Sequence, residues 1–413
     1  MDNTGVNGHK ATDPAGRIFS ELIAYALQLE SAEGKGHREF SALRPGLYDG
    51  VSGLALFFAA YYRATRDAQA HKVALKALAS VREKIQQLVA NPGLRRSGSL
   101  AVGGLVGMGS LLYALTTTAD WLNVPELLGT ASDLAGMIAP EWIRADTSLD
   151  VINGCAGTLL AILAFSRVAR TQGINAQSAV DLATECGHHL LRSRVKASNG
   201  LRAWPGPRGI PCAGFAHGVT GIAYALSRLF EQANEEKFRE AAFEGLAFER
   251  TLYVPEQQGW LDTHSNRITE RGSWCCGAPG IALGRLGCLA ALDEPAVRRD
   301  LEEALRITLA LPEAANDQLC CGNFGNIDIL HTAGSALGRL RLSDQALECS
   351  RKIVQRSQLH GFIFMPPSHY NGDSQAYQYN PSLFLGMAGV GYTLLRLNHP
   401  DVFPSVLLLE TQQ

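Results

Sequence analysis

The residues best suited to chemistry in this 413-residue chain are two pairs of adjacent cysteines. Cys275 and Cys276 stand directly before one glycine, and Cys320 and Cys321 stand directly before another. Thiolate ligands favour zinc and other soft or borderline metal ions over hard cations. Two thiol pairs in the same local context therefore predict a metal site, provided that the fold brings the pairs together.

A histidine and an aspartate occur in the same context. His217 directly precedes a glycine, as Cys276 and Cys321 do, and Asp150 stands four residues before Gly154. A histidine titrates near neutral pH and is suited to general acid or base catalysis, and a carboxylate can orient it. The sequence therefore predicts thiols, an imidazole and a carboxylate in equivalent places of one repeated element.

That element is a short Gly-x-x-Gly turn that recurs along the whole chain and opens an apolar, alanine- and leucine-rich segment. Helices with so little polar surface are buried on most sides, so each turn predicts the start of an inner helix. Aligning the repeats on their first glycine places the candidate residues at one end of neighbouring helices. The turns are Gly50–Gly53, Gly104–Gly107, Gly154–Gly157, Gly218–Gly221, Gly277–Gly280, Gly322–Gly325 and Gly386–Gly389.

Charged amphipathic stretches alternate with these turns and predict outer helices. In one of them, Leu78, Val81, Ile85 and Leu88 follow the three-and-four spacing of a single helical stripe. We expect an all-α fold, an α/α toroid (barrel) of seven inner and seven outer helices, because only a closed ring covers the terminal repeats equally. The expected outer helices are 17–31, 69–89, 127–143, 177–195, 235–253, 295–311 and 344–358.

Composition narrows the class of protein. A formal net charge of −2 and the lack of a basic stripe argue against a nucleic-acid partner. No apolar run has the length of a membrane span and the N-terminus does not resemble a signal peptide, so we expect a cytoplasmic protein without membrane insertion. The polar first residues predict a flexible N-terminal tail at 1–16, and the evenly spread repeats predict a single barrel domain at 17–413.

The other cysteines and histidines fit structural positions. Four cysteines lie in helical patterns and are interpreted as small buried apolar residues: Cys155, Cys186, Cys288 and Cys349. Cys212, in a loop before His217, is given the same interpretation. Three isolated histidines are also interpreted as structural: His264, His331 and His369. The loops 196–216 and 361–381 either border an entrance or simply pack over the barrel mouth.

Taken in order, these motifs resemble those of the lanthionine cyclases, LanC and the C-terminal cyclase domain of LanM. The resemblance covers essentially the whole chain, and the Trp-Cys-x-Gly-x-Pro-Gly element is specific. It implies an α/α toroid with a zinc ion in its cavity. The motifs are Asp150 with Asn153-Gly154, His217-Gly218, Trp274-Cys275-x-Gly277-x-Pro279-Gly280 and Cys320-Cys321-Gly322.

The resemblance also implies a ligand set. Cys275, Cys320 and Cys321 would bind Zn2+. Most members of the family have Cys-His-Gly where this chain has Cys320-Cys321-Gly322. The version with three cysteines resembles a LanM branch, which favours a LanM-like cyclase domain over a stand-alone LanC.

By the same resemblance, His217 is the catalytic acid/base, Asp150 is its partner, and Arg271, four residues before Cys275, lines the site. Three protein ligands leave the fourth tetrahedral position of zinc open to a substrate cysteine, and only a thiolate is a good nucleophile. We expect conjugate addition to dehydroalanine or dehydrobutyrine, which forms lanthionine or methyllanthionine thioether rings. His217 would protonate the resulting enolate, and Arg271 would stabilise the developing negative charge.

The implied partners are a dehydrated precursor peptide, leader plus core, and a dehydratase. The chain has no phosphate-cradling or kinase-like motif, so dehydration is expected on a separate enzyme or dehydratase domain. Two alternatives stay open. The same zinc site could add a free thiol such as glutathione to dehydroamino acids, or the protein could be a peptide-binding scaffold with a closed structural zinc held by all four paired cysteines.

Overall fold

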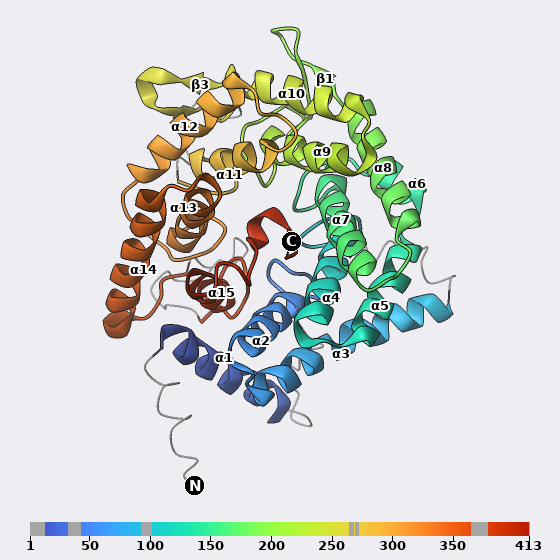
Figure 1. Cartoon of the computed structure of the whole chain (residues 1–413), viewed down its shortest axis with the longest axis vertical. Coiled ribbons are helices and arrows are strands. Elements are labelled where there is room, and N and C mark those ends of the chain that lie inside the picture. The colour runs from blue at the N-terminus through green and yellow to red at the C-terminus, as the bar shows by residue number, and fades with distance from the viewer. Residues whose placement is uncertain are drawn as a thin grey trace.

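The computed structural model describes residues 13–31, 43–91, 101–263, 268, 272–364 and 379–412. Within these ranges nearly all regular structure is helical, and the helices form a ring (Figure 1). The expected tail at 1–16 lies mostly outside the described residues, and the first helix begins at Pro14. No helix in the described ranges combines the length and the apolar character that a membrane span requires.

Inner helices line the ring in the described part of the chain. Each begins directly after a glycine with extended backbone. Their burial is nearly complete where neighbours pack on both sides: all residues of Val51–Tyr61 are buried. The seven inner helices are α2 (Val51–Thr65), α4 (Met108–Leu122), α7 (Cys155–Thr171), α9 (Val219–Ala233), α11 (Ala278–Cys288), α13 (Asn323–Leu337) and α15 (Met387–Asn398).

Outer helices pack around them and confirm the predicted α/α toroid. The seven outer helices of the described ranges are α1 (Pro14–Ser31), α3 (Ala68–Ala90), α5 (Pro125–Met137), α8 (Gln177–Arg192), α10 (Glu236–Arg250), α12 (Pro295–Leu309) and α14 (Leu340–His360). The first of them packs against the last inner helix, which closes the ring. The stretch expected as one helix at 127–143 is divided, because Pro140 cannot continue α5 and instead begins the short α6 (Pro140–Arg144).

The second glycine of a turn is required by close packing. The turn folds back over the first turn of its helix, so that a Cβ on Gly280 would lie 1.9 Å from the carbonyl oxygen of Trp274. One repeat departs from the predicted register: α4 follows Gly107 rather than Gly104. Gly104 is needed for a different contact, since a Cβ there would lie 2.5 Å from the Cα of Gly157 in the next repeat.

Backbone hydrogen bonds join the loops before the inner helices into a closed circle. The amide of Ala216 donates to the carbonyl of Cys275 at 3.1 Å, and the amides of Cys320 and Phe384 donate at 3.0 Å to the carbonyls of Phe384 and Tyr48. Further bonds complete the circle, two of them donated by the amides of Val151 and Trp274 to the carbonyls of Ala216 and Cys320. We call the residues two positions before each glycine cap the rim circle: Tyr48, Leu105, Ile152, Ala216, Cys275, Cys320 and Phe384.

The rim has a buried and an accessible side. All residues of the rim circle are buried except Tyr48, which is half-buried. None of the residues directly before the caps is buried, and we call this set the rim face: Asp49, Val106, Asn153, His217, Cys276, Cys321 and Leu385. One step along the chain therefore moves a side chain from the interior to a surface that a substrate can reach.

Two small antiparallel sheets lie on the outside of the ring. One pairs β1 (Val195–Lys196) with β2 (Arg202–Ala203), and the other pairs β3 (Tyr253–Val254) with β4 (Gly259–Trp260) across η3 (Pro255–Gln257).

The C-terminal segment, with η4 (Val406–Leu408), lies near the middle of the ring (Figure 1). Tyr113 on α4 donates to the carbonyl of Glu410 at 2.7 Å, and Tyr224 on α9 donates to its carboxylate at 2.9 Å.

Candidate active site

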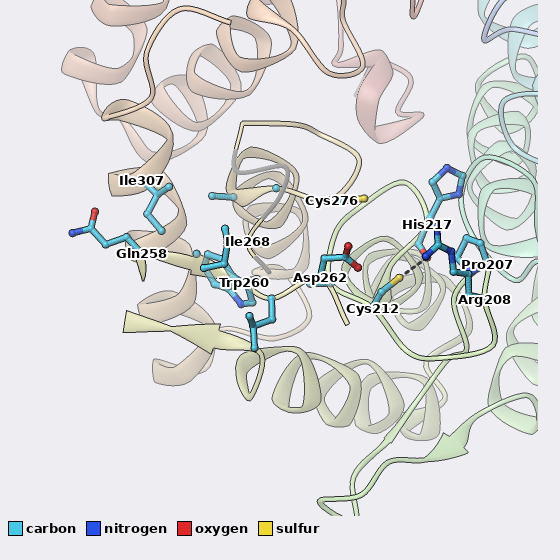
Figure 2. A pocket seen from close by; sticks show the side chains of 15 residues that line it. Pro207, Arg208, Cys212, His217, Gln258, Trp260, Asp262, Ile268, Cys276 and Ile307 are labelled. Atoms are coloured by element: carbon cyan, nitrogen blue, oxygen red, sulfur yellow. Dashed lines mark hydrogen bonds between the residues drawn. The ribbon is translucent and has the colours of Figure 1, made fainter. Parts of the chain in front are cut away.

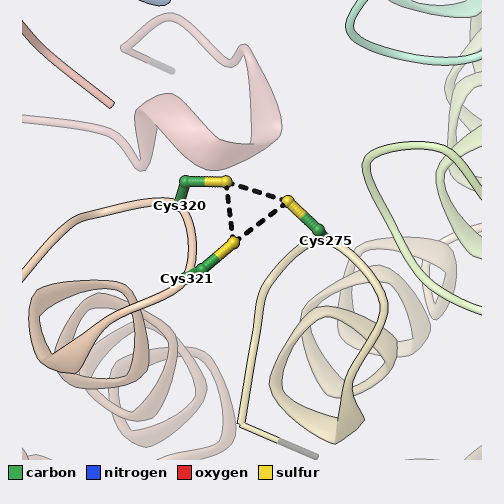
Figure 3. Close-up of side chains that lie close together, drawn as sticks. All are labelled: Cys275, Cys320 and Cys321. Carbon is green, nitrogen blue, oxygen red and sulfur yellow. Dashed lines mark hydrogen bonds between the residues drawn. The ribbon is translucent and has the colours of Figure 1, made fainter. Parts of the chain in front are cut away.

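Three predicted zinc ligands come together at the rim, and we call them the thiol triad: Cys275, Cys320 and Cys321 (Figure 3). The Sγ of Cys275 lies 2.8 Å from that of Cys320 and 3.4 Å from that of Cys321, and the last two are 3.2 Å apart. None of them is in a disulfide. Two ligands come from the rim circle and one from the rim face, so the triad is buried on one side and accessible on the other.

The thiol triad has the donor chemistry that zinc prefers. Its sulfurs approach more closely than unbonded sulfur atoms ordinarily pack, and they come from two loops that the rim circle holds rigidly. Three such ligands fit a tetrahedral zinc site with one position left for substrate. The fourth paired cysteine, Cys276, is not part of the group and lines a neighbouring cavity instead. The closed site with four cysteines is therefore not formed.

Hydrogen bonds favour a thiolate within the triad. Bonds from Cys275, Cys321 and the hydroxyl of Tyr48 hold the pKa of Cys320 well below its ordinary value, against the opposing effect of burial. Burial, together with the nearby cysteines, raises the pKa of Tyr48, so its hydroxyl stays protonated and donates to Cys320 at 3.1 Å. A negative sulfur at this position favours binding of a cation.

Sequence reasoning missed Tyr48, although a signal was present. Tyr48 stands two residues before its glycine cap, as Cys275 and Cys320 do. Because the rim closes between the last and the first repeat, Tyr48 is brought near Cys320 across a separation of 272 residues. Only the closure of the ring makes these positions neighbours.

The predicted histidine and aspartate form a pair. Nδ1 of His217 lies 2.7 Å from Oδ2 of Asp150, and the other carboxylate oxygen accepts the amide of Asn153 at 2.6 Å. Asp150 is 3% exposed, whereas the side chain of His217 is 29% exposed. Since the buried carboxylate accepts the proton on Nδ1, it leaves Nε2 available for proton exchange.

Close backbone packing fixes His217 next to the thiol triad. Gly214 has φ +116°, and a Cβ there would lie 2.3 Å from the carbonyl oxygen of Cys275. Only glycine combines that backbone conformation with that contact. The loop that carries His217 therefore lies directly against the loop that carries Cys275.

A buried carboxylate holds both ends of this loop. Glu249 on α10 accepts the amide of Gly214 at 2.8 Å and the hydroxyl of Thr220, which stand three residues before and three after His217. Arg285 on α11, fully buried, pairs with Glu249 at 2.7 Å. Nothing in the sequence distinguishes Glu249 from the other acidic residues of α10, so this support could not be predicted.

A second group of potential metal ligands lies nearby: Asp146, Cys155 and His189. The carboxylate of Asp146 accepts the amides of Leu149 at 3.0 Å and Cys155 at 2.8 Å, and Nε2 of His189 lies 2.8 Å from the Asp146 carbonyl oxygen. Leu149 has φ +61°, a strained conformation directly before Asp150. This group holds the turn that presents Asp150.

The other residues and loops singled out in the sequence lie in different parts of the chain, and some are outside the described residues. Arg271 lies outside the described residues, as do His264 and His369 and most of the loop 361–381. His331 on α13 is buried, and burial lowers its pKa. The loop 196–216 carries the first small sheet and lines the cavity beside His217. The four cysteines that were expected in helices do lie in helices. Of these, Cys155, Cys186 and Cys288 are buried, and Cys349 is half-buried.

Comparisons with known proteins agree with this architecture. The lacticin 481/lactococcin biosynthesis protein LcnDR2 of Lactococcus lactis subsp. lactis is 21% identical over 373 residues, which are 86% of this chain and 36% of that protein. The chain thus spans about a third of the length of this relative. The structure of nisin cyclase is similar with a TM-score of 0.67 and 16% identity, covering 95% of this chain and 96% of nisin cyclase, which supports the fold.

The sequence model of the family described as lanthionine synthetase C-like protein matches residues 41–408. This match includes every turn of the ring, the thiol triad and the His217–Asp150 pair. The chain belongs to the lanthionine synthetase C-like family.

Proposed function

We propose that this protein is a zinc-dependent lanthipeptide cyclase, which adds peptide cysteine thiols to dehydroalanine or dehydrobutyrine and forms lanthionine or methyllanthionine rings. The observation that carries the proposal is the convergence of three sulfurs within 3.4 Å of one another on rim loops adjacent to the His217–Asp150 pair. Membership of the family and the biosynthetic role of the lacticin relative support it.

The thiol triad would hold the zinc ion. When bound, zinc lowers the pKa of a thiol that coordinates it, so that a cysteine of the substrate is available as thiolate at neutral pH. The partly exposed Cys321 gives the substrate access to the centre, while the buried Cys275 and Cys320 anchor it. Tyr48 stabilises negative charge on Cys320 through its hydroxyl.

His217 would complete the reaction as general acid. Attack of the sulfur on the β-carbon forms a carbon–sulfur bond and moves the alkene electrons toward the carbonyl, which gives an enolate. A proton delivered to the α-carbon from His217 restores the amide, and the proton released by the thiol restores the imidazolium. The buried Asp150 fixes the orientation of the imidazole ring through its contact with Nδ1.

The role of Arg271 and the type of cyclase domain are proposed from sequence motifs alone. Arg271 would stabilise the developing negative charge on the carbonyl oxygen, as its place four residues before Cys275 suggests. The set of three cysteines favours a LanM-like cyclase domain, acting on a precursor peptide that a dehydratase or a dehydratase domain supplies. None of the nine cysteines is in a disulfide, which supports a location in the reducing cytoplasm.

The test is incubation with a dehydrated precursor peptide, followed by alkylation of free thiols and mass spectrometry. Cyclisation protects each cysteine from alkylation without a change in peptide mass. We expect protection with the metal-loaded protein, loss of protection after chelation, and loss with Cys275→Ser. The matched control Cys349→Ser, a change on the outer helix α14, should retain both metal and activity.

Two results would overturn the proposal. Protection that survives complete removal of zinc would show that ring formation does not need the metal. If added glutathione is attached to the dehydrated peptide while no ring forms, the protein uses a free thiol and is not a cyclase.

A further inference from the structure

A cavity of about 300 Å3 lies beside the thiol triad, between the loop before α9, the β3–β4 segment and the end of α12 (Figure 2). One part of its wall is formed by the rim-face residues His217 and Cys276. Because Cys276 directly follows Cys275, this cavity adjoins both the candidate acid and the thiol triad. A group that reacts next to His217 therefore has the cavity at its side.

The other part of the wall is apolar. Trp260, Ile268 and Ile307 lie away from His217 in the same cavity (Figure 2). Trp260 is 6% and Ile307 4% exposed, so these two side chains are packed in the wall, while Ile268 is half-buried. Transfer of apolar surface from water to such a wall is favourable, whereas a charged group would lose hydration there without a matched partner.

Two charged residues also line the cavity. Asp262 and Arg208 line the cavity near the His217 side (Figure 2). A carboxylate accepts peptide N–H groups and a guanidinium donates to peptide carbonyls, so the pair is suited to a peptide backbone. With one charge of each sign, the two residues do not select a strongly charged substrate.

We infer that this cavity binds an aliphatic or aromatic side chain of the substrate peptide, on a residue next to the dehydroamino acid. The inference rests on the proposed cyclase function, which places the dehydroamino acid against His217. Consecutive Cα atoms are about 3.8 Å apart, so a neighbouring side chain reaches the adjoining cavity. The volume is at the lower end for ligand pockets, which fits one side chain rather than several residues.

The first experiment uses two dehydrated peptides that differ only next to the reactive residue, with leucine in one and glycine in the other. The expected preference for leucine in kcat/KM is about tenfold or more, carried by KM, as for an apolar pocket that loses several methyl or methylene groups. Ile307→Ala should reduce that preference to about threefold or less. The matched control Leu305→Ala, an equally buried change on α12 outside the cavity, should leave it intact.

A binding measurement separates this inference from the proposed function. Calorimetry with unreactive peptides, in which alanine replaces the dehydroamino acid, reports the preference for leucine without any chemistry. A parent protein that binds the leucine and glycine peptides equally overturns the inference, even if it forms rings. Failure of both dehydrated peptides to cyclise, with the leucine preference in binding retained, instead counts against the proposed function.

Two further outcomes decide the occupant. If Ile307→Ala does not fold, Trp260→Phe takes its place and should weaken the leucine preference in the binding assay. Competition between glutathione and the unreactive leucine peptide would assign the cavity to a free thiol compound and overturn the inference.

Discussion

Two groups of potential metal ligands lie in the described part of this protein, and only one of them has an arrangement that suits a metal ion. In the thiol triad the sulfurs point at one another and accept hydrogen bonds that lower the pKa of Cys320. In the second group the carboxylate of Asp146 already accepts backbone amides and His189 is bonded to a carbonyl oxygen. Burial raises the pKa of Cys155 well above its ordinary value, so this thiol stays protonated.

The difference shows that residue type and proximity do not by themselves define a metal site. A ligand must have a lone pair that the fold has not already used. In the second group the Asp146 carboxylate accepts backbone amides and Nε2 of His189 donates to a carbonyl oxygen. These bonds hold a strained turn that presents Asp150 to His217. The thiol triad is thus suited to chemistry, whereas the group of Asp146, Cys155 and His189 positions Asp150. Mutations in the two groups should therefore have different effects.

The largest expected difference is in metal binding. Cys320→Ala should abolish stoichiometric zinc binding and reduce cyclisation by at least about 100-fold, since even residues that only support metal ligands contribute 10- to 100-fold. Cys155→Ala should keep zinc and most of the activity. Metal analysis of the two purified variants checks the prediction; equal zinc loss from both would erase the distinction between the groups.

The second-largest expected difference is between His217 and His189, in the rate of cyclisation. His217→Ala should reduce cyclisation by about 100- to 10,000-fold, the usual contribution of a general acid, with zinc content unchanged. His189→Ala should leave the rate within about threefold, because its ring only bonds the Asp146 carbonyl. The rates of the two variants are compared at saturating peptide. A similar loss of rate in both would contradict the assignment of His217 as the general acid.

Asp146→Ala should act on stability. The backbone amides of Leu149 and Cys155 lose their acceptor, which costs about 1–3 kcal/mol in the free energy of unfolding. Denaturant unfolding of the zinc-loaded protein measures this change. Zinc content should stay at the parent level, and a variant that loses zinc would show that Asp146 belongs to the metal centre.

The smallest effect is expected from Tyr48→Phe. Loss of the phenol hydrogen bond removes a group that stabilises the thiolate, so the pKa of Cys320 in metal-free protein should rise, and the thiolate should form at higher pH. Ultraviolet absorbance of the thiolate during a pH titration measures the shift. Activity of the zinc-loaded enzyme should fall by about tenfold, the lower end of the contribution of residues that support metal ligands. An unchanged titration would remove Tyr48 from the site.

Much of the fold could be predicted because local rules dominate it. Apolar segments after Gly-x-x-Gly turns predicted the inner helices, and amphipathic stripes predicted the outer ones. The errors are local: α4 begins after Gly107 rather than Gly104, and Pro140 divides one outer helix. At the first place Gly104 packs against Gly157 of the next repeat, and at the second Pro140 cannot continue a helix. The spacing of apolar residues contains neither effect.

The sequence by itself determined the ring, the register of six of the seven repeats and the residue types at the rim, because helix caps and apolar spacing are short-range properties. Only the tertiary structure decided which thiols meet, that Cys276 faces a separate cavity, and that Tyr48 and Glu249 support the site. Such contacts depend on ring closure and on packing between helices far apart in the chain. A one-dimensional pattern does not encode those distances.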